Sequence, residues 1–183
     1  MVMSTTSLMP IEEHLRLTEK PYREYRDGVV SAKTKPTKLH SIVQYTLLML
    51  LRGRGVQALP ELTVRISPTK YLVPDVSVAG DFPGPYATEP VLLCCEILSP
   101  EDRLGAMLGK CEEYHAWGVP FCWVIDPVKR TAWEYHAAAE PERVTAEKCS
   151  RLPARSLKPT IRRNFAWRTE PRNSGLSMRI AAR

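Results

Sequence analysis

Two carboxylates in this sequence occupy positions where a buried site could use them. Glu96 lies inside the apolar run of residues 91–98, and Asp75 opens the segment of residues 74–78. Such runs are typical of buried strands, where a charge is costly unless it is paired or binds a metal ion. If the two strands are neighbours, the carboxylates converge and could hold a hard divalent cation such as Mg²⁺. The alternative is that Glu96 ends its strand in water or pairs with an arginine.

Two further residues could complete a site for phosphodiester hydrolysis. Glu24 lies on the first strand of an expected hairpin, and Lys110 lies on an expected helix, at the edge of its buried face. A bound metal ion would polarise a phosphoryl oxygen and activate a water molecule. The lysine could orient that water or stabilise charge in the transition state. Each residue also has an ordinary interpretation: Glu24 as an exposed strand acid, and Lys110 as a lysine whose stem covers apolar surface.

Local patterns predict the elements that must position Glu24 and the first half of the chain. Residues 22–32 predict a hairpin, because Asp27-Gly28 is a strong signal for a tight turn between strands. Residues 37–52 predict a helix with Thr37 as its cap and Gly53 at its end. Apolar residues of this helix follow helical spacing: Leu39, Ile42, Val43, Leu47, Leu50 and Leu51. His40 lies in the first turn, where a structural or solvated histidine is the ordinary interpretation and a functional one the alternative.

The second half of the chain predicts a strand, a helix and a pair of strands. The helix is expected to start at Ser99-Pro100, with Asp102 favoured in its first turn by the helix dipole, and to end near Trp117. Residues 121–125 predict a second apolar strand, and residues 131–136 predict its antiparallel return. The whole order predicts an α/β (α+β) fold with a mixed central β-sheet flanked by helices.

Composition and charge divide the 183 residues into three parts. Residues 1–9 are expected to be disordered, residues 10–150 to form one globular domain, and residues 151–183 to form a basic tail. The net charge is +6, and the tail has eight arginines and one lysine against one glutamate. A basic tail can bind nucleic acid through phosphates. The alternative is a solvated, poorly ordered end.

Cysteine usage and the apolar runs indicate a cytoplasmic protein. The five cysteines are an odd number, none has Cys-x-x-Cys spacing, and all are expected to be reduced and mostly buried. No ligand pair has the spacing of a zinc site. The N-terminal residues lack the pattern of a signal peptide, and no apolar run is long enough to span a membrane.

Several motifs together resemble one known family. They are Pro74-Asp75-Val76, Glu96-Ile97-Leu98-Ser99-Pro100, Lys110, Tyr114, Gly118-Val119 and Trp123-Val124-Ile125-Asp126-Pro127. In this order they resemble the Uma-two family of restriction endonucleases, which belongs to the PD-(D/E)xK nuclease superfamily. The resemblance covers roughly residues 24–136.

The resemblance implies a restriction-endonuclease-like core, metal-dependent cleavage of DNA and a homodimer. The implied cofactor is Mg²⁺, with Mn²⁺ as a substitute. Asp75, Glu96 and Glu24 would be the metal ligands. Lys110 would be a lysine displaced onto the following helix, because Leu98 occupies the usual lysine position of the superfamily. Asp102 could replace an acid that relatives carry before this lysine, with helix capping as its alternative role.

The leading hypothesis is therefore a Mg²⁺-dependent endonuclease that hydrolyses DNA phosphodiester bonds. A first alternative is a nuclease-fold protein without catalysis that binds nucleic acid or a protein partner. A second alternative is a structural protein that keeps only the fold. Cleavage that needs a divalent ion separates the first hypothesis from the other two.

Overall fold

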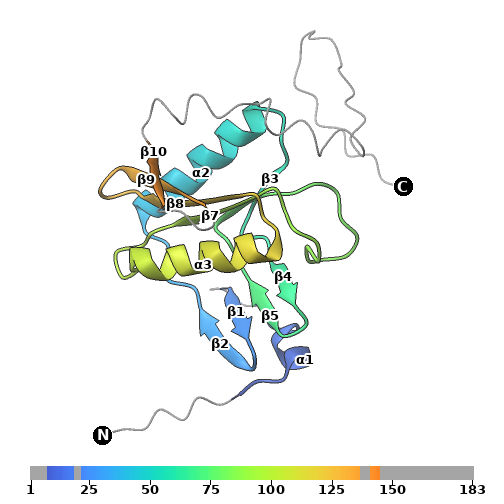
Figure 1. The fold of residues 1–183 in the computed structure, drawn as a ribbon. Coiled ribbons are helices and arrows are strands. Elements are labelled where there is room, and N and C mark those ends of the chain that lie inside the picture. Colours follow the sequence, from blue (N-terminus) through green and yellow to red (C-terminus); the bar gives the residue numbers. More distant parts are fainter. Residues whose placement is uncertain (1–7, 19–21, 137–140, 145–183) are drawn as a thin grey trace, which may run out of the picture.

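The computed structural model describes residues 8–18, 22–136 and 141–144 (Figure 1). The predicted basic tail, the fifth cysteine and residues 1–7 lie outside these ranges. The helices are α1 (Ile11–His14), α2 (Lys38–Gly53) and α3 (Leu104–Trp117), and the strands are β1 (Arg23–Arg26), β2 (Val29–Ala32), β3 (Ala58–Pro60), β4 (Val64–Ser67), β5 (Lys70–Leu72), β6 (Val76–Val78), β7 (Leu93–Ile97), β8 (Phe121–Asp126), β9 (Thr131–Tyr135) and β10 (Glu142–Val144).

The central sheet has six strands in the order β10-β9-β8-β7-β6-β3. β7 and β8 are parallel and are joined through α3, whereas the other neighbouring pairs are antiparallel. A parallel pair needs a crossover connection, and a helix is the usual one. The expected mixed central sheet flanked by helices is confirmed.

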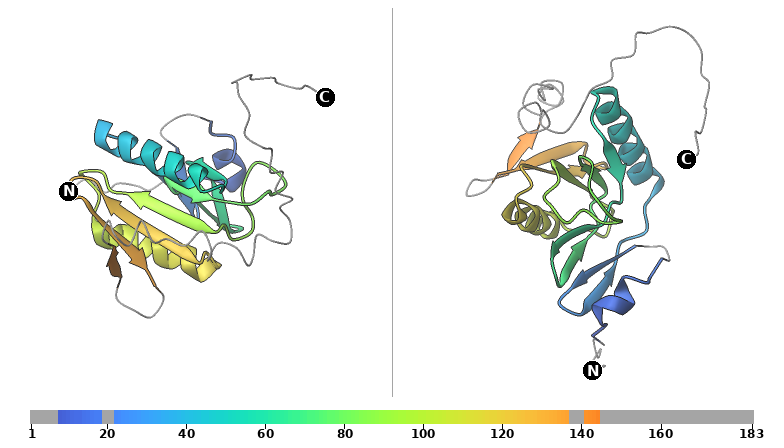
Figure 2. Two further views of the ribbon diagram at one scale, coloured as in Figure 1. Left: turned by 90° about the horizontal axis from the view of Figure 1, so that it is seen from above. Right: turned by 90° about the vertical axis from the view of Figure 1, so that its right-hand side faces the viewer.

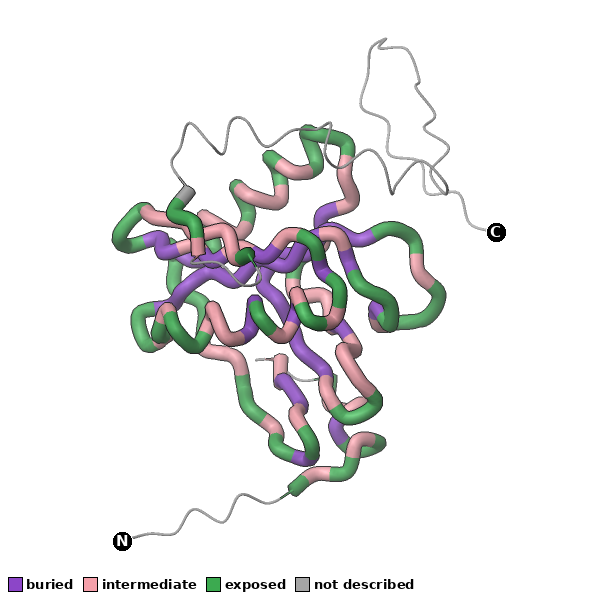
Figure 3. The backbone as a smooth tube through the Cα atoms, in the orientation of Figure 1, coloured by how far each residue is buried: buried purple, intermediate pink, exposed green. Residues whose placement is uncertain are grey.

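Helices α2 and α3 cover opposite faces of this sheet (Figures 1 and 2). The adjacent residues Cys94 and Cys95 on β7 show the same division, because successive strand side chains point to opposite faces. Cys94 packs in the cluster that includes Tyr114 of α3, and Cys95 packs in the cluster that includes Leu47 of α2. The buried residues therefore concentrate along the middle strands (Figure 3).

The N-terminal hairpin belongs to a second, four-stranded sheet in the order β2-β1-β5-β4. The predicted hairpin is confirmed, with Asp27 at φ 49° and Gly28 at φ 91° in the turn. These positive φ values suit Asp-Gly, because glycine carries no Cβ and aspartate tolerates this region. This sheet lies on the α3 side of the central sheet (Figures 1 and 2), so β1 approaches α3.

The cap of α2 is confirmed, because the Thr37 side chain accepts a hydrogen bond from the His40 backbone N–H at 3.2 Å. Only part of its apolar pattern is buried. Val43, Leu47 and Leu51 pack against the central sheet. The remaining predicted residues and two neighbours are exposed: Leu39, Ile42, Tyr45, Met49 and Leu50. The apolar pattern of this helix is wider than the sheet face that it contacts.

Helix α3 begins at Leu104, so the prediction of a start at Ser99-Pro100 was wrong. Asp102 explains the difference, because its side chain accepts a hydrogen bond from the Ser99 N–H at 2.7 Å and its own N–H donates to the Ser99 carbonyl at 3.0 Å. Local side-chain bonds of this kind compete with helix formation. Residues 99–102 therefore form a closed turn before the helix.

The four cysteines in the described residues are free and buried, as expected: Cys94, Cys95, Cys111 and Cys122. Burial raises the pKa of the Cys94 and Cys95 thiols well above the ordinary value. Across the part of the chain that the structure describes, no helix is long and apolar enough to cross a membrane.

Candidate active site

Asp75 and Glu96 lie next to each other because β6 and β7 are antiparallel neighbours. Val76 pairs with Cys95, and the same register brings the preceding Asp75 beside Glu96. Asp75 lies just before β6, so it continues this register at the end of the strand. The Ile97 N–H donates to Asp75 Oδ2 at 2.7 Å, which fixes the orientation of this carboxylate. The conditional prediction that the two acids converge is met, with 3% of Asp75 and 2% of Glu96 exposed.

Lys110 joins Glu96 to the third acid, Glu24. Its Nζ lies 2.7 Å from Glu96 Oε1 and 2.8 Å from Glu24 Oε1. α3 covers the sheet face from which Glu96 projects, and β1 brings Glu24 within ion-pair distance of the same lysine. The Val73 N–H also donates to Glu24 Oε1 at 3.2 Å. All four residues proposed from the sequence therefore form one buried cluster.

Burial and charge act in opposite directions on this cluster. Burial disfavours the ionised form of Glu24, but Lys110, Arg26 and the Val73 N–H together outweigh burial and lower the pKa of Glu24 below its ordinary value. Burial dominates at Glu96, whose pKa is raised even though Lys110 and Lys33 oppose the shift. Burial alone would lower the pKa of Lys110, but Glu96 and Glu24 raise it above the ordinary value. Lys110 therefore stays protonated at neutral pH.

Sequence reasoning missed a second lysine at the site, Lys33. It follows β2, and its Nζ lies 2.5 Å from Asp75 Oδ1 and 3.9 Å from Glu96 Oε2. The same ammonium donates to the Val73 carbonyl at 2.6 Å. Lys33 lies in a linker without hydrophobic periodicity, and 42 residues separate it from Asp75. The only signal in the sequence for a residue such as Lys33 was charge balance, because two buried carboxylates need a second cation.

Helix α2 contributes His40 and Gln44. His40 is 6% exposed, its Nε2 lies 3.7 Å from Asp75 Oδ1, and its Nδ1 lies 3.4 Å from the Ser99 hydroxyl. Gln44 Nε2 donates to the Asp75 backbone carbonyl at 2.9 Å. The functional alternative for His40 therefore gains a geometric basis, because the ring faces the Asp75 carboxylate.

Asp102 lies near the site but bonds to the turn before α3. One carboxylate oxygen accepts from the Ser99 N–H, and the other accepts from the Thr34 hydroxyl at 3.1 Å. These contacts connect the turn to the linker that carries Lys33. Asp102 therefore serves as a local cap for the turn rather than for a helix.

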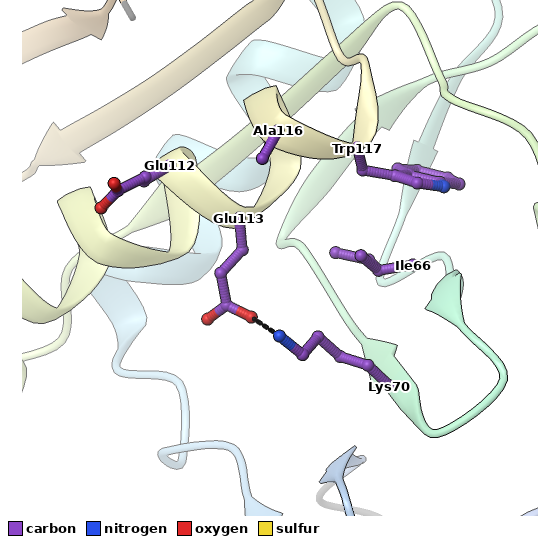
Figure 4. Close-up of a pocket in the computed structure, with 6 residues that line it drawn as sticks. All are labelled: Ile66, Lys70, Glu112, Glu113, Ala116 and Trp117. Atoms are coloured by element: carbon purple, nitrogen blue, oxygen red, sulfur yellow. Dashed lines mark ion pairs between the residues drawn. The ribbon is translucent and has the colours of Figure 1, made fainter. Parts of the chain in front are cut away.

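A line of ion pairs runs from the acid cluster to the protein surface. Arg26 NH1 lies 3.0 Å from Glu24 Oε2, and Arg26 NH2 lies 3.4 Å from Glu113 Oε1. Glu113 Oε2 pairs with Lys70 at 2.9 Å, at a surface hollow between α3 and the β4–β5 hairpin (Figure 4). The hollow is lined by Ile66, Lys70, Glu112, Glu113, Ala116 and Trp117. It contains none of the predicted site residues, but its ion pair supports the arginine that holds Glu24.

Tyr114 fixes the orientation of Glu96 from within the core. It is fully buried, and its hydroxyl donates to Glu96 Oε1 at 2.7 Å. Tyr114→Phe should lower the free energy of unfolding by about 1.5–3 kcal/mol, the usual loss for a hydrogen bond to a charged group. Urea unfolding measures this, with the exposed Tyr45→Phe as the matched control. Equal stability of both variants would mean that this hydrogen bond contributes nothing.

The donor set suits a hard cation, although its arrangement is not a ready-made cluster of ligands. Within the described ranges, no group of three His, Cys, Asp or Glu side chains is placed to hold a metal ion. The Lys33 ammonium lies between Asp75 and Glu96 and contacts oxygen atoms of the kind that Mg²⁺ prefers. Glu24 is occupied by Lys110 and Arg26, so its role as a metal ligand stays a prediction.

A family model and a solved structure each match this chain. The sequence model of the Uma2 family, described as "Putative restriction endonuclease", matches residues 11–170. The chain is also similar to a crystal structure from Anabaena variabilis ATCC 29413, described as "a putative nuclease belonging to DUF820", with a TM-score of 0.65. The two share 24% sequence identity, over 74% of this chain and 83% of that chain. At this identity the likeness establishes a common fold. A comparison with curated proteins finds no match.

Proposed function

Because the chain belongs to the Uma2 family, whose description reads "Putative restriction endonuclease", we propose that it is a Mg²⁺-dependent endonuclease that hydrolyses DNA phosphodiester bonds. The observation that carries the proposal is the pair of buried carboxylates, Asp75 and Glu96, with an ammonium group on each side of Glu96. Carboxylates placed beside lysines serve metal-assisted phosphoryl chemistry. Mn²⁺ would substitute for Mg²⁺.

Asp75 and Glu96 would hold the ion, because each directs one oxygen toward the position that Lys33 occupies. The bound ion would supply Lewis-acid polarisation of the phosphoryl group and a more acidic water molecule. The Ile97 N–H donates to Asp75 Oδ2, and the Tyr114 hydroxyl donates to Glu96 Oε1. These hydrogen bonds keep the other two oxygens, Asp75 Oδ1 and Glu96 Oε2, directed toward Lys33. Such supporting hydrogen bonds tune ligands in metal sites generally.

Lys110 would stabilise negative charge at the phosphoryl group and would not act as a base. Its pKa is raised because Glu96 and Glu24 outweigh the effect of burial, so it carries its proton at neutral pH. Glu24 also holds this ammonium, with its Oε1 at 2.8 Å from Lys110 Nζ. We therefore assign Glu24 in this arrangement to the positioning of Lys110, and a contact of Glu24 with the ion would require Lys110 to release it.

Plasmid cleavage tests the proposal. Supercoiled plasmid incubated with the full chain and Mg²⁺ should be nicked or linearised, and EDTA should stop the reaction. Asp75→Asn should reduce the rate by about a hundredfold or more, because it removes charge that has to act in the transition state. The exposed Asp81→Asn should cleave like the wild type. Cleavage that persists in EDTA, or an Asp75→Asn variant that is fully active, would contradict the proposal.

One observation favours the alternative of a catalytically silent protein that binds nucleic acid or a protein partner. Lys33 already neutralises the carboxylates that would hold an ion. Salt-dependent retention of DNA without cleavage would support this alternative. The homodimer and the cytoplasmic location stay predictions, and sedimentation of the purified chain would test the first.

A further inference from the structure

We propose that Lys33 is a tethered cation that occupies the divalent-ion position of the site and is displaced when the ion binds. The inference rests on the proposed function, since it concerns the same pair of carboxylates. It adds a competition between the Lys33 ammonium and the divalent ion, which the sequence motifs do not predict. Lys33 would make metal binding weaker and would stabilise the protein without metal.

The oxygen atoms around Lys33 Nζ are of the kinds that bind hard metal ions. It contacts a carboxylate oxygen of Asp75 at 2.5 Å and the backbone carbonyl oxygen of Val73 at 2.6 Å. A second carboxylate oxygen, from Glu96, lies at 3.9 Å. Carboxylate and backbone carbonyl oxygens together form the usual ligand set of a hard divalent cation. An ion at this position would therefore use the atoms that the ammonium now uses.

The ion and the ammonium cannot both occupy this position. Two cations a few ångströms apart in a buried site repel each other strongly, because the local dielectric constant is low. Lys110 cannot relieve this repulsion by leaving, since it is 8% exposed and held between two carboxylates. Binding of the ion therefore requires Lys33 to move.

Lys33 can leave without disturbing the fold around it. Its backbone N–H stays bonded to the Tyr22 carbonyl at 2.9 Å, so the four-carbon stem can rotate while the chain remains anchored. The residue lies in the linker between β2 and α2, and its side chain is 14% exposed. The Lys110 side chain is similarly buried, at 10% exposed, but it is held on α3 between two close carboxylates, so Lys33 is the cation that we expect to move.

Mn²⁺ binding to the full chain tests this competition without reference to activity. Electron paramagnetic resonance of free Mn²⁺ gives Kd, and thermal unfolding with and without Mn²⁺ gives a second readout. Lys33→Met should lower Kd by about tenfold or more, a change equal to roughly 1.4 kcal/mol. It should also lower the melting temperature without metal and increase the upward shift that Mn²⁺ produces. Lys35→Met removes the same charge from the same exposed linker and should bind like the wild type.

Each outcome decides the inference. A Kd for Lys33→Met equal to or weaker than that of the wild type overturns it, and the proposed function then survives because the wild type still binds the ion. A wild type and a Lys33→Met variant that both fail to bind Mn²⁺ overturn the metal site itself. Lys33→Gln keeps a donor for the Val73 carbonyl without the charge. It should reproduce the tighter binding if Lys33→Met fails to fold.

Discussion

Lys110→Met should lower the free energy of unfolding at pH 7 by about 3–5 kcal/mol, which is the usual cost of removing one partner of a buried ion pair. The lysine is the only group within reach of both Glu24 and Glu96 among the described ion pairs. Without it, Glu96 keeps only the distant Lys33 ammonium at 3.9 Å and the Tyr114 hydroxyl. Urea unfolding at constant ionic strength measures the loss.

The pH dependence of this loss follows from the same contacts. In the wild type, Lys110 contributes the largest of the interactions that lower the pKa of Glu24 below 4.5. The stability that ionised Glu24 provides is therefore present above pH 4.5 and is lost as the pH falls through the lowered pKa. Without Lys110, burial should raise the pKa of Glu24, and the pKa of Glu96, already raised by burial, should rise further. Folding of the variant then takes up protons, and its stability rises as the pH falls. The difference between the two proteins should therefore shrink from pH 7 to pH 5.

Two controls separate this explanation from simple loss of packing. Lys70→Met breaks the Lys70–Glu113 pair, whose side chains are 29% and 28% exposed, and should cost at most about 1 kcal/mol. Lys110→Met combined with Glu96→Gln removes the uncompensated charge and should recover much of the lost stability. If the double variant is as unstable as the sum of the single variants, the loss arises from packing and not from charge.

Glu96→Gln should reduce plasmid cleavage by about a thousandfold or more while the protein stays folded, because it removes charge from the position that must hold the ion. The amide oxygen can still accept the Tyr114 hydrogen bond, and Lys110 keeps Glu24 as a partner. The change in the free energy of unfolding should therefore be small beside the loss of activity. Parallel assays of cleavage and of urea unfolding measure the two effects.

The matched control for this variant is Glu89→Gln, an exposed glutamate on the loop before β7. It makes the same chemical change outside the cluster and should leave cleavage unchanged. Activity of Glu96→Gln close to that of the wild type would remove Glu96 from the site. Loss of activity together with unfolding would show only that Glu96 is structural, and the circular dichroism spectrum distinguishes this case.

The local elements were predictable because their signals lie within a few residues of each other. Asp27-Gly28 predicts the turn through its tolerance of positive φ, and Thr37 predicts the start of α2 through its side-chain bond. The start of α3 was predicted wrongly because Asp102 can bond to Ser99 in a turn as readily as it can support a helix. Where two local signals are equally strong, tertiary contacts decide at which residue the helix begins.

The sequence by itself determined that two buried strands carry carboxylates and that a lysine lies at the edge of a buried helix face. It did so because an acid inside an apolar run has to find a partner. Only the tertiary structure decided which cation meets which acid. Lys33 reaches Asp75 across 42 residues, and Arg26 reaches Glu113 across 87 residues. No periodicity marks such contacts, since they depend on which strands become neighbours and on which sheet face α3 covers.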